Sequence, residues 1–208
     1  MQNKLLLLIV VLLSIIYIDI RSTKNISIFN DKENNITVKD IENNTITNLD
    51  IEQYLIGVLA GEMPASFNDE ALKAQAVVAR TYTLYKLKFA QTRHEFGADM
   101  CDDINCCQAF KTKDLFLSSW GDEEGQRRWQ KYELAVNDTL GKAITYNNQL
   151  INAFFHAHSG GKTEYVKYLW AKESIPYLVS VSGNEGYIYQ DSKTISRDEL
   201  ISIFKNEI

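Results

Sequence analysis

The sequence of 208 residues is poor in proline and cysteine, and positive charge is not in excess. It contains two prolines and three cysteines, and its formal net charge is −5. Nucleic-acid-binding proteins need a basic surface that neutralises phosphate groups, so the composition excludes that class of protein. The acidic balance also disfavours passive attraction to anionic polymers. A polymeric ligand of this kind would therefore have to be held by a shaped groove.

Long hydrophobic runs are also scarce, but one lies near the N-terminus. Residues 5–18 are almost continuously apolar, with Lys4 before them and Asp19 and Arg21 after them. We expect a single-pass transmembrane anchor over residues 1–21, although the run is shorter than the ~20 residues that span a bilayer easily. A cleaved signal peptide is the alternative, but no small-x-small cleavage pattern follows. Because the positive charge precedes the run, we expect a cell-membrane protein whose folded part is extracytoplasmic.

The rest of the sequence has the composition of an ordinary folded domain. The chain is 45% hydrophobic and 11% aromatic, which is enough for one sizeable core. We expect one domain over residues 22–208. Alternating patterns at residues 26–28 and 36–38 predict short strands that are joined by asparagine turns.

Two apolar patterns of helical spacing follow, separated by a proline. The first covers Ile51–Ala60, with Asp50 as its expected N-cap. The second should begin at Ser66 or Asn68 and continue to about Phe89.

A carboxylate lies at the break between these two helices. Because a proline disfavours the α conformation in the residue before it, Met63 should be extended and the first helix should end near Gly61. Glu62 would then project from the break. Partial burial of a carboxyl group there favours its protonated form, which a general acid needs. An exposed loop glutamate is the alternative, since most loop carboxylates are solvated.

The segment around Glu62 is similar to a known family. The residues GEMPASFNDEALKAQAVVARTY resemble the SpoIID/LytB family, whose hallmark is a Glu-Met-Pro followed by a helix that reads EALKAQAVAARTY. Two later segments, DMCDDINCCQAF and FFHAHSGGKTE, resemble the second and third signatures of that family. The resemblance covers roughly residues 50–208. It implies a peptidoglycan lytic transglycosylase of sporulation engulfment in which Glu62 is the one catalytic residue.

The resemblance also implies a mechanism and partners. A lytic transglycosylase protonates the bond between N-acetylmuramic acid and N-acetylglucosamine with one carboxylic acid. The carboxylate then acts as base on the muramoyl C6 hydroxyl, so no second carboxylate is needed. Family members act on strands that an amidase-endopeptidase has stripped of peptides, which implies a membrane-bound complex. A non-catalytic wall-binding modifier of an amidase, as in the LytB branch, is the alternative.

Four polar residues are candidates for binding the glycan substrate. Lys73, Gln75 and Arg80 interrupt the apolar pattern of the second expected helix. An arginine inside a helix is tolerated when it has a carboxylate or ligand to meet, although a solvated arginine is commoner. Ser159 precedes two glycines, which permit positive φ and a close approach of the backbone to a ligand. This turn would form a cleft wall or, alternatively, a plain loop.

The three cysteines lie within seven residues, at positions 101, 106 and 107, and His94 precedes them. Zinc takes four nitrogen or sulfur ligands, so we expect a structural zinc held by His94, Cys101, Cys106 and Cys107. Family members that bind zinc have a similar run of histidine and cysteine. A disulfide from Cys101 to one of the other two cysteines is the alternative in an oxidising compartment.

The C-terminal third should contain a β-hairpin. Residues 142–146 and 150–155 read as strands around an Asn147-Asn148 turn. His156 and His158 would alternate beyond it, and neither is given a role. The predicted fold class is therefore α+β, with helices packed on antiparallel strands. Since nothing here resembles the family's Gly-His-Gly-rich segment, we expect the domain to be truncated at its C-terminus.

Overall fold

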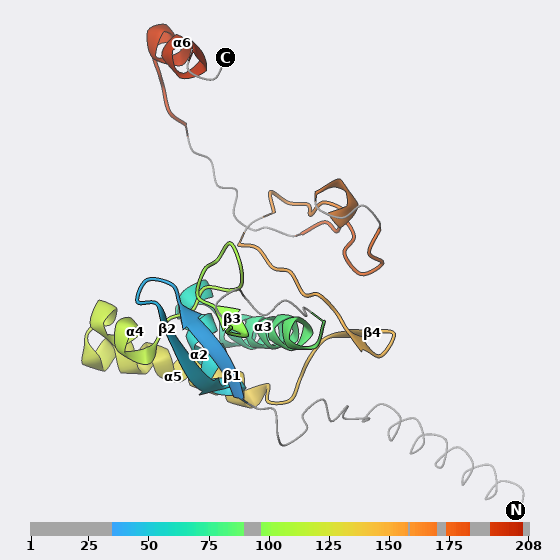
Figure 1. The fold of residues 1–208 in the computed structure, drawn as a ribbon. Coiled ribbons are helices and arrows are strands. Elements are labelled where there is room, and N and C mark those ends of the chain that lie inside the picture. Colours follow the sequence, from blue (N-terminus) through green and yellow to red (C-terminus); the bar gives the residue numbers. More distant parts are fainter. Residues whose placement is uncertain (1–34, 90–96, 158, 170–173, 184–191, 206–208) are drawn as a thin grey trace, which may run out of the picture. The chain divides into compact units, whose positions relative to one another are not determined.

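The computed structural model describes residues 35–89, 97–157, 159–169, 174–183 and 192–205 (Figure 1). The chain forms two compact units, residues 1–154 and 155–208, which we describe separately. The described residues of the first unit form four helices, α2 to α5, and five short strands, β1 to β5. The predicted α+β class is therefore confirmed. Among the described residues, no helix is long and apolar enough to cross a bilayer, and the expected anchor over residues 1–21 lies outside them.

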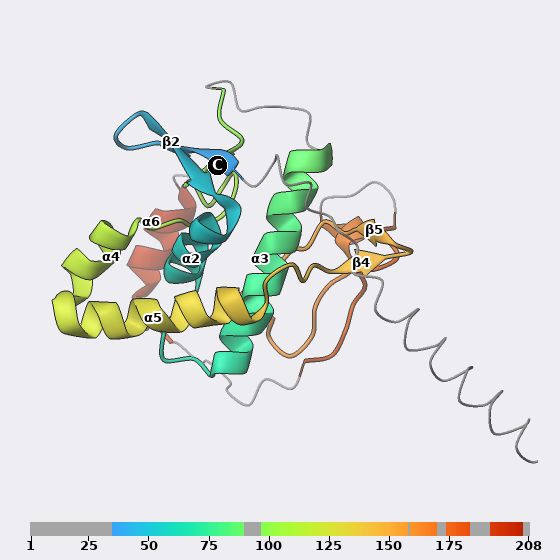
Figure 2. The same ribbon diagram turned by 90° about the horizontal axis from the view of Figure 1, so that it is seen from below.

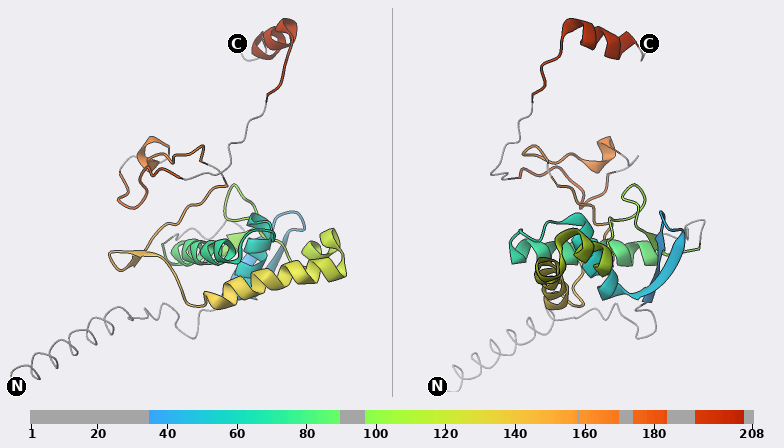
Figure 3. Two further views of the ribbon diagram at one scale, coloured as in Figure 1. Left: turned by 180° about the vertical axis from the view of Figure 1, so that it is seen from behind. Right: turned by 90° about the vertical axis from the view of Figure 1, so that its left-hand side faces the viewer.

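A three-stranded sheet forms one side of the first unit. Strand β1 (Asn35–Asp40) pairs antiparallel with β2 (Thr45–Asp50) and parallel with β3 (Met100–Cys101), in the order β2-β1-β3. Asn44 takes a φ of 54° in the turn of the hairpin, as expected for asparagine. The strand predicted at residues 36–38 is confirmed, whereas the one at residues 26–28 lies outside the described residues. The right-hand view of Figure 3 shows the hairpin beside the helices.

Two helices carry the sequence around the proline. Helix α2 (Ile51–Glu62) begins directly after β2, and the Asp50 carboxylate accepts hydrogen bonds from two amides of its first turn. Met63 is extended, with φ −130° and ψ 135°, as the following proline requires. Helix α3 (Asp69–Phe89) begins after Asn68, whose side chain accepts a hydrogen bond from a first-turn amide. Both predicted helices and the predicted N-cap are confirmed, and the first helix continues one residue past Gly61.

The core lies where α2 meets α3 and α5. Helices α4 (Lys113–Trp120) and α5 (Asp122–Asp138) follow the sheet, and Figure 2 shows α5 running across α2 and α3. Burying one large apolar side chain stabilises a fold by roughly 1.5–3 kcal/mol, and α2 contributes several. Side chains with less than 2% exposure in this core include Tyr54, Leu55, Val58, Leu59, Leu72, Ala76, Ala79, Tyr132 and Val136. Helix α2 is therefore the central element of the first unit.

The predicted hairpin after residue 140 is much shorter than expected. Strands β4 (Thr145–Tyr146) and β5 (Gln149–Leu150) pair around two asparagines with positive φ, so the turn is confirmed. The strands predicted over residues 142–146 and 150–155 are wrong in extent. The carbonyl of Lys142 accepts from Arg80, and the amide of Ile144 donates to the Thr81 hydroxyl. Side chains of α3 thus occupy the backbone groups that a longer ladder would need.

The second unit contains little regular structure among its described residues. It comprises a single 3₁₀ turn (Val166–Tyr168), an antiparallel bridge between Lys162 and Ser182, and helix α6 (Arg197–Lys205). Gly160 and Gly161 have φ values of 69° and 93°, so their predicted positive φ is confirmed. His156 is exposed and lies outside any strand, so the predicted strand alternation at that residue is wrong.

Candidate functional site

Glu62 is the last residue of α2 and is partly exposed. Its Oε1 accepts a hydrogen bond of 2.7 Å from the backbone N–H of Ala109, a residue 47 positions away. Because Oε1 is the acceptor, Oε2 is the oxygen on which a transferable proton can reside. The carboxyl group is therefore held in one orientation with one oxygen still available.

Two glycines let the segment around Ala109 reach α2. Gly57 and Gly61 lie one turn apart and face residues 109–111. A Cβ on Gly61 would stand 2.8 Å from the Ala109 carbonyl carbon, and one on Gly57 would stand 2.7 Å from the Lys111 carbonyl oxygen. The Lys111 amide donates to the Gly57 carbonyl at 3.1 Å. This role of the two glycines was not predicted, although the sequence has a Gly-x-x-x-Gly spacing directly before Glu62.

Helix α5 holds the chain just after Glu62. The Tyr132 hydroxyl donates to the Met63 carbonyl at 2.6 Å, and Lys131 donates to the carbonyls of Ala65 and Phe67 at 2.7 and 3.1 Å. Burial raises the pKa of Tyr132, so its hydroxyl stays a donor at neutral pH. The turn after Glu62 is thus fixed from a helix that begins sixty residues later. The sequence carried no short-range signal for these contacts.

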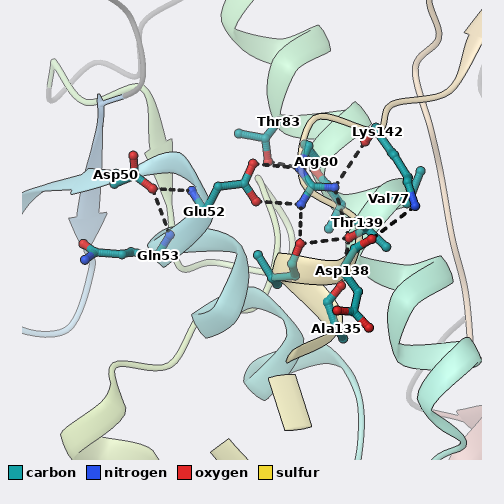
Figure 4. Close-up of polar contacts among 12 residues, drawn as sticks. Asp50, Glu52, Gln53, Val77, Arg80, Thr83, Ala135, Asp138, Thr139 and Lys142 are labelled. Carbon is teal, nitrogen blue, oxygen red and sulfur yellow. Dashed lines mark hydrogen bonds and ion pairs between the residues drawn. The ribbon is translucent and has the colours of Figure 1, made fainter. Parts of the chain in front are cut away.

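Arg80 lies in the core, with no exposed surface (Figure 4). It donates to both oxygens of Glu52 at 2.9 and 2.6 Å, and to the carbonyls of Val136 and Lys142 at 3.2 Å. Glu52 is therefore the carboxylate that the sequence predicted as a possible partner of Arg80. Because its donors are occupied within the fold, Arg80 does not offer a surface that a sugar could reach, and the expectation of a substrate contact is corrected to a structural role.

The other predicted substrate-binding residues are Lys73, Gln75 and Ser159. Lys73 pairs with Glu70 at 2.9 Å and Asp138 at 3.0 Å, and hydrogen bonds to these two carboxylates raise its pKa. The Gln75 Nε2 is buried and makes no hydrogen bond to another described residue. Ser159 belongs to the second unit. No hydrogen bond between described residues joins Lys73 or Gln75 to Glu62, so their contact with a glycan stays a prediction.

The three cysteines form a cluster. Their sulfur atoms all lie within 4.8 Å of one another, the Cys106 and Cys107 sulfurs are 3.9 Å apart, and none of the three is in a disulfide. Tetrahedral zinc with Zn–S bonds of about 2.3 Å requires sulfurs about 3.8 Å apart, so the donor set fits. The Cys101 amide also donates to the Cys107 sulfur at 3.4 Å. The predicted fourth ligand, His94, lies outside the described residues.

In the absence of a metal ion, the surroundings of the cluster favour the protonated form of the thiols. Burial is the main reason why the pKa values of Cys101 and Cys107 are raised. Lys86 stands beside the cluster and donates to the Cys106 carbonyl at 3.2 Å. Partial burial alone would lower the pKa of Lys86, but Tyr82 and the thiols outweigh it and raise that pKa. Metal binding would therefore displace protons from the thiols.

A separate cleft of about 520 Å³ lies between the β1–β2 hairpin, α2 and the start of α4. Its lining includes Phe110, one residue after Ala109, together with Lys111 and Trp129, but it does not include Glu62. The cleft and the carboxylate are therefore distinct features of the first unit.

Comparison with known proteins identifies the family. The family model described as SpoIID, stage II sporulation protein, matches residues 39–146, which is more than half of the chain. This match includes both α2 and the cysteine cluster. The chain belongs to the SpoIID family. The resemblance noted in the sequence is thereby confirmed.

Two stage II sporulation proteins and an amidase enhancer are among the curated relatives of this SpoIID-family chain. The chain is 38% identical to stage II sporulation protein D of Bacillus subtilis over 152 residues. This alignment covers 72% of the chain and 44% of the relative. The corresponding protein of Bacillus amyloliquefaciens is 39% identical over 130 residues, or 62% of the chain and 37% of the relative. An amidase enhancer of Bacillus subtilis is 33% identical over 146 residues, or 70% of the chain and 17% of the relative. The chain thus spans less than half the length of each of these relatives.

Proposed function

We propose that this SpoIID-family chain is a peptidoglycan lytic transglycosylase that cleaves the bond between N-acetylmuramic acid and N-acetylglucosamine during sporulation engulfment. The observation that carries the proposal is the carboxyl group of Glu62, whose Oε1 is held by the Ala109 amide. Membership of the family supports a role in sporulation. The relative named amidase enhancer supports a connection with the cell wall.

One carboxyl group suffices for this reaction. Glu62 would donate the proton on Oε2 to the glycosidic oxygen as the bond to muramoyl C1 breaks. The resulting carboxylate would then remove the proton of the C6 hydroxyl as O6 bonds to C1, giving 1,6-anhydro-N-acetylmuramic acid. The nucleophile belongs to the sugar, so the site needs neither a second carboxylate nor a bound water. The Ala109 hydrogen bond would keep the same orientation in both steps.

The cysteine cluster is proposed to hold zinc with His94 as the fourth ligand. Three sulfurs within 4.8 Å of one another suit a closed structural site better than one with an open position for substrate. Zinc would thus stabilise the loop between β3 and α4 and would not take part in bond cleavage.

The cellular setting is likewise a proposal. Residues 1–21 would anchor the protein in the cell membrane, with the domain on the outer side facing the wall. An amidase-endopeptidase that removes stem peptides would be its partner. The similarity to an amidase enhancer supports such a partnership.

The activity can be tested directly on defined glycan. The full-length protein would be incubated with peptide-stripped glycan strands, and the products would be analysed by mass spectrometry. We expect new 1,6-anhydromuramoyl ends, which are 18 mass units lighter than hydrolysed ends, roughly one water. Products with reducing muramoyl ends would instead indicate a hydrolase, and an absence of products would contradict the proposal.

A second candidate function is a non-catalytic modifier of an amidase. The observation in its favour is the 33% identity to an amidase enhancer. In that case the protein should accelerate amidase digestion of intact wall, and the Glu62→Gln variant should accelerate it equally well. If the protein is instead a lytic transglycosylase, the Glu62→Gln variant should release no 1,6-anhydromuramoyl ends.

A further inference from the structure

Gln108 lies between the cysteine cluster and the candidate catalytic glutamate. It directly follows Cys107, directly precedes Ala109 and is 1% exposed. Its Nε2 donates to the Thr83 hydroxyl at 3.1 Å, and that hydroxyl donates its own proton to the Ala79 carbonyl at 2.9 Å. Since the Thr83 oxygen can then only accept, the Gln108 side chain must present its amide nitrogen to α3.

The Gln108 side chain also lies beside the hydroxyl of Tyr54, a residue of α2 with no exposed surface. Burial raises the pKa of Tyr54, and Gln108 acts against that shift. The Tyr54 hydroxyl therefore stays protonated beside the Gln108 side chain. One buried side chain thus lies between the two helices that flank the proline break.

The peptide bond after Gln108 connects this anchor to Glu62. The N–H that Glu62 accepts belongs to Ala109, so it lies in the plane of the Gln108–Ala109 peptide group. Because that plane is rigid, the direction of the N–H depends on where the Gln108 backbone is held. The Gln108 side chain is held against Thr83, and the peptide group that follows Gln108 carries the N–H that orients the Glu62 carboxyl group.

We infer that Gln108 is a positioning residue for Glu62, acting through the Ala109 amide. This inference rests on the proposed function only where it concerns turnover. The effect of Gln108 on the orientation of the Ala109 amide and the Glu62 carboxyl group does not depend on the proposed activity. The cysteines that precede Gln108 would support the same segment from its other end, since Cys106 and Cys107 are next to it in the chain.

Two substitutions break the Gln108 anchor without touching Glu62 or Ala109. Gln108→Met keeps the length of the side chain and removes its hydrogen bonds, while Thr83→Val removes the acceptor. Thr81→Val is the matched control. Thr81 lies on the same helix and is equally buried, but its hydroxyl accepts from the Ile144 amide and donates to the Val77 carbonyl. All three variants are compared with the wild type in the full-length chain.

The first readout is hydrogen exchange of the Ala109 amide, followed by NMR. Weakening or loss of the Ala109 hydrogen bond should speed the exchange by about tenfold or more. We expect this in Gln108→Met and in Thr83→Val, but not in Thr81→Val. Unchanged exchange at Ala109 in both anchor variants would overturn the inference, whether or not the protein cleaves glycan. Should Gln108→Met fail to fold, Thr83→Val alone decides.

The second readout is turnover. Misorientation of the acid should lower kcat by about tenfold or more and leave KM nearly unchanged, while Thr81→Val keeps both. Equal losses in the control and the anchor variants would show a general effect of stability and contradict a positioning role. If the wild type forms no anhydro ends, the proposed activity fails and the exchange at Ala109 still decides the inference.

Discussion

Two ionisable residues on neighbouring helices, Glu62 and Arg80, have opposite surroundings. Glu62 is partly exposed at the end of α2, and an amide holds one of its oxygens. Arg80 is wholly buried on α3, and Glu52 neutralises it. A carboxyl group with a free oxygen is suited to proton transfer, whereas a saturated buried ion pair is suited to holding elements together. Substitution at each residue should therefore have a different kind of effect.

Replacing Glu62 by Gln should abolish cleavage and preserve the fold. Glutamine has the same shape and can still accept the Ala109 hydrogen bond, but it cannot donate a proton to a leaving group. We expect turnover to fall ~10²-fold or more. The measurement is the rate at which 1,6-anhydromuramoyl ends form, together with glycan binding. Turnover at the wild-type rate would rule out Glu62 as the general acid.

Replacing Arg80 by Met should destabilise the protein by about 3 kcal/mol, because the partly buried Glu52 then loses its partner. Urea denaturation measures this change. Arg127→Met is the control, since its ion pair with Glu124 is exposed and should contribute about 1 kcal/mol or less. An Arg80 variant of normal stability with a raised KM for glycan would instead restore the substrate role predicted from the sequence.

At the scale of elements, the close approach of α2 and residues 109–111 depends on two glycines. Gly57→Ala and Gly61→Ala would each place a methyl group within 3 Å of neighbouring backbone atoms. Overpacking of this kind costs about 1–3 kcal/mol, which exceeds the gain of roughly 1 kcal/mol from better helix propensity. Denaturant midpoints measure the loss for each variant.

Gly125→Ala on α5 is the control for these two variants. Its new methyl group would meet mainly the end of the Leu117 side chain, at 2.8 Å, and that end can move. A smaller loss of stability than at Gly57 or Gly61 is therefore expected. Equal losses at all three positions would mean that the approach of residues 109–111 to α2 is not especially tight.

At the scale of the whole molecule, the cysteine cluster ties distant parts of the chain together. Cys101 belongs to β3, which pairs with β1, and Cys107 precedes the segment that packs on α2. Protein purified without chelator should contain one zinc per chain, and removing it should lower the thermal midpoint, because the site cannot preform in the unfolded chain. Cys106→Ser should reduce the zinc content. Absence of zinc together with a Cys101 disulfide in mass mapping would favour the oxidised alternative.

The N-terminal segment should keep the whole protein on the membrane. The apolar run at residues 5–18 has Lys4 and the α-amino group before it, while Asp19 offsets Arg21 after it. This arrangement predicts a cytoplasmic N-terminus and an external domain. The full-length protein should fractionate with membranes, retain Met1 and be cleaved by external protease. Recovery of a soluble form that begins after Ile20 would show that the segment is a removed signal.

Several features of the first unit follow from the sequence alone, because they depend on neighbouring residues. Pro64 forces Met63 to be extended, Asp50 caps the helix that follows it, and two asparagines form the tight turn at 147–148. The steric and hydrogen-bond effects responsible act over one to four residues. The residues around Glu62 were also enough to indicate the family, which the match over residues 39–146 then showed.

The environment of each functional side chain was decided only by the tertiary structure. The partner of Glu62 lies 47 positions away at Ala109, and Arg80 meets Glu52 and the Lys142 carbonyl from 28 and 62 positions away. The contact of Arg80 with the Lys142 carbonyl, together with that of Thr81 with the Ile144 amide, uses backbone groups that the predicted longer hairpin would need. A local pattern specifies which backbone conformation is favourable, but which groups meet is decided by how the helices pack around a shared core, and that depends on the whole chain at once.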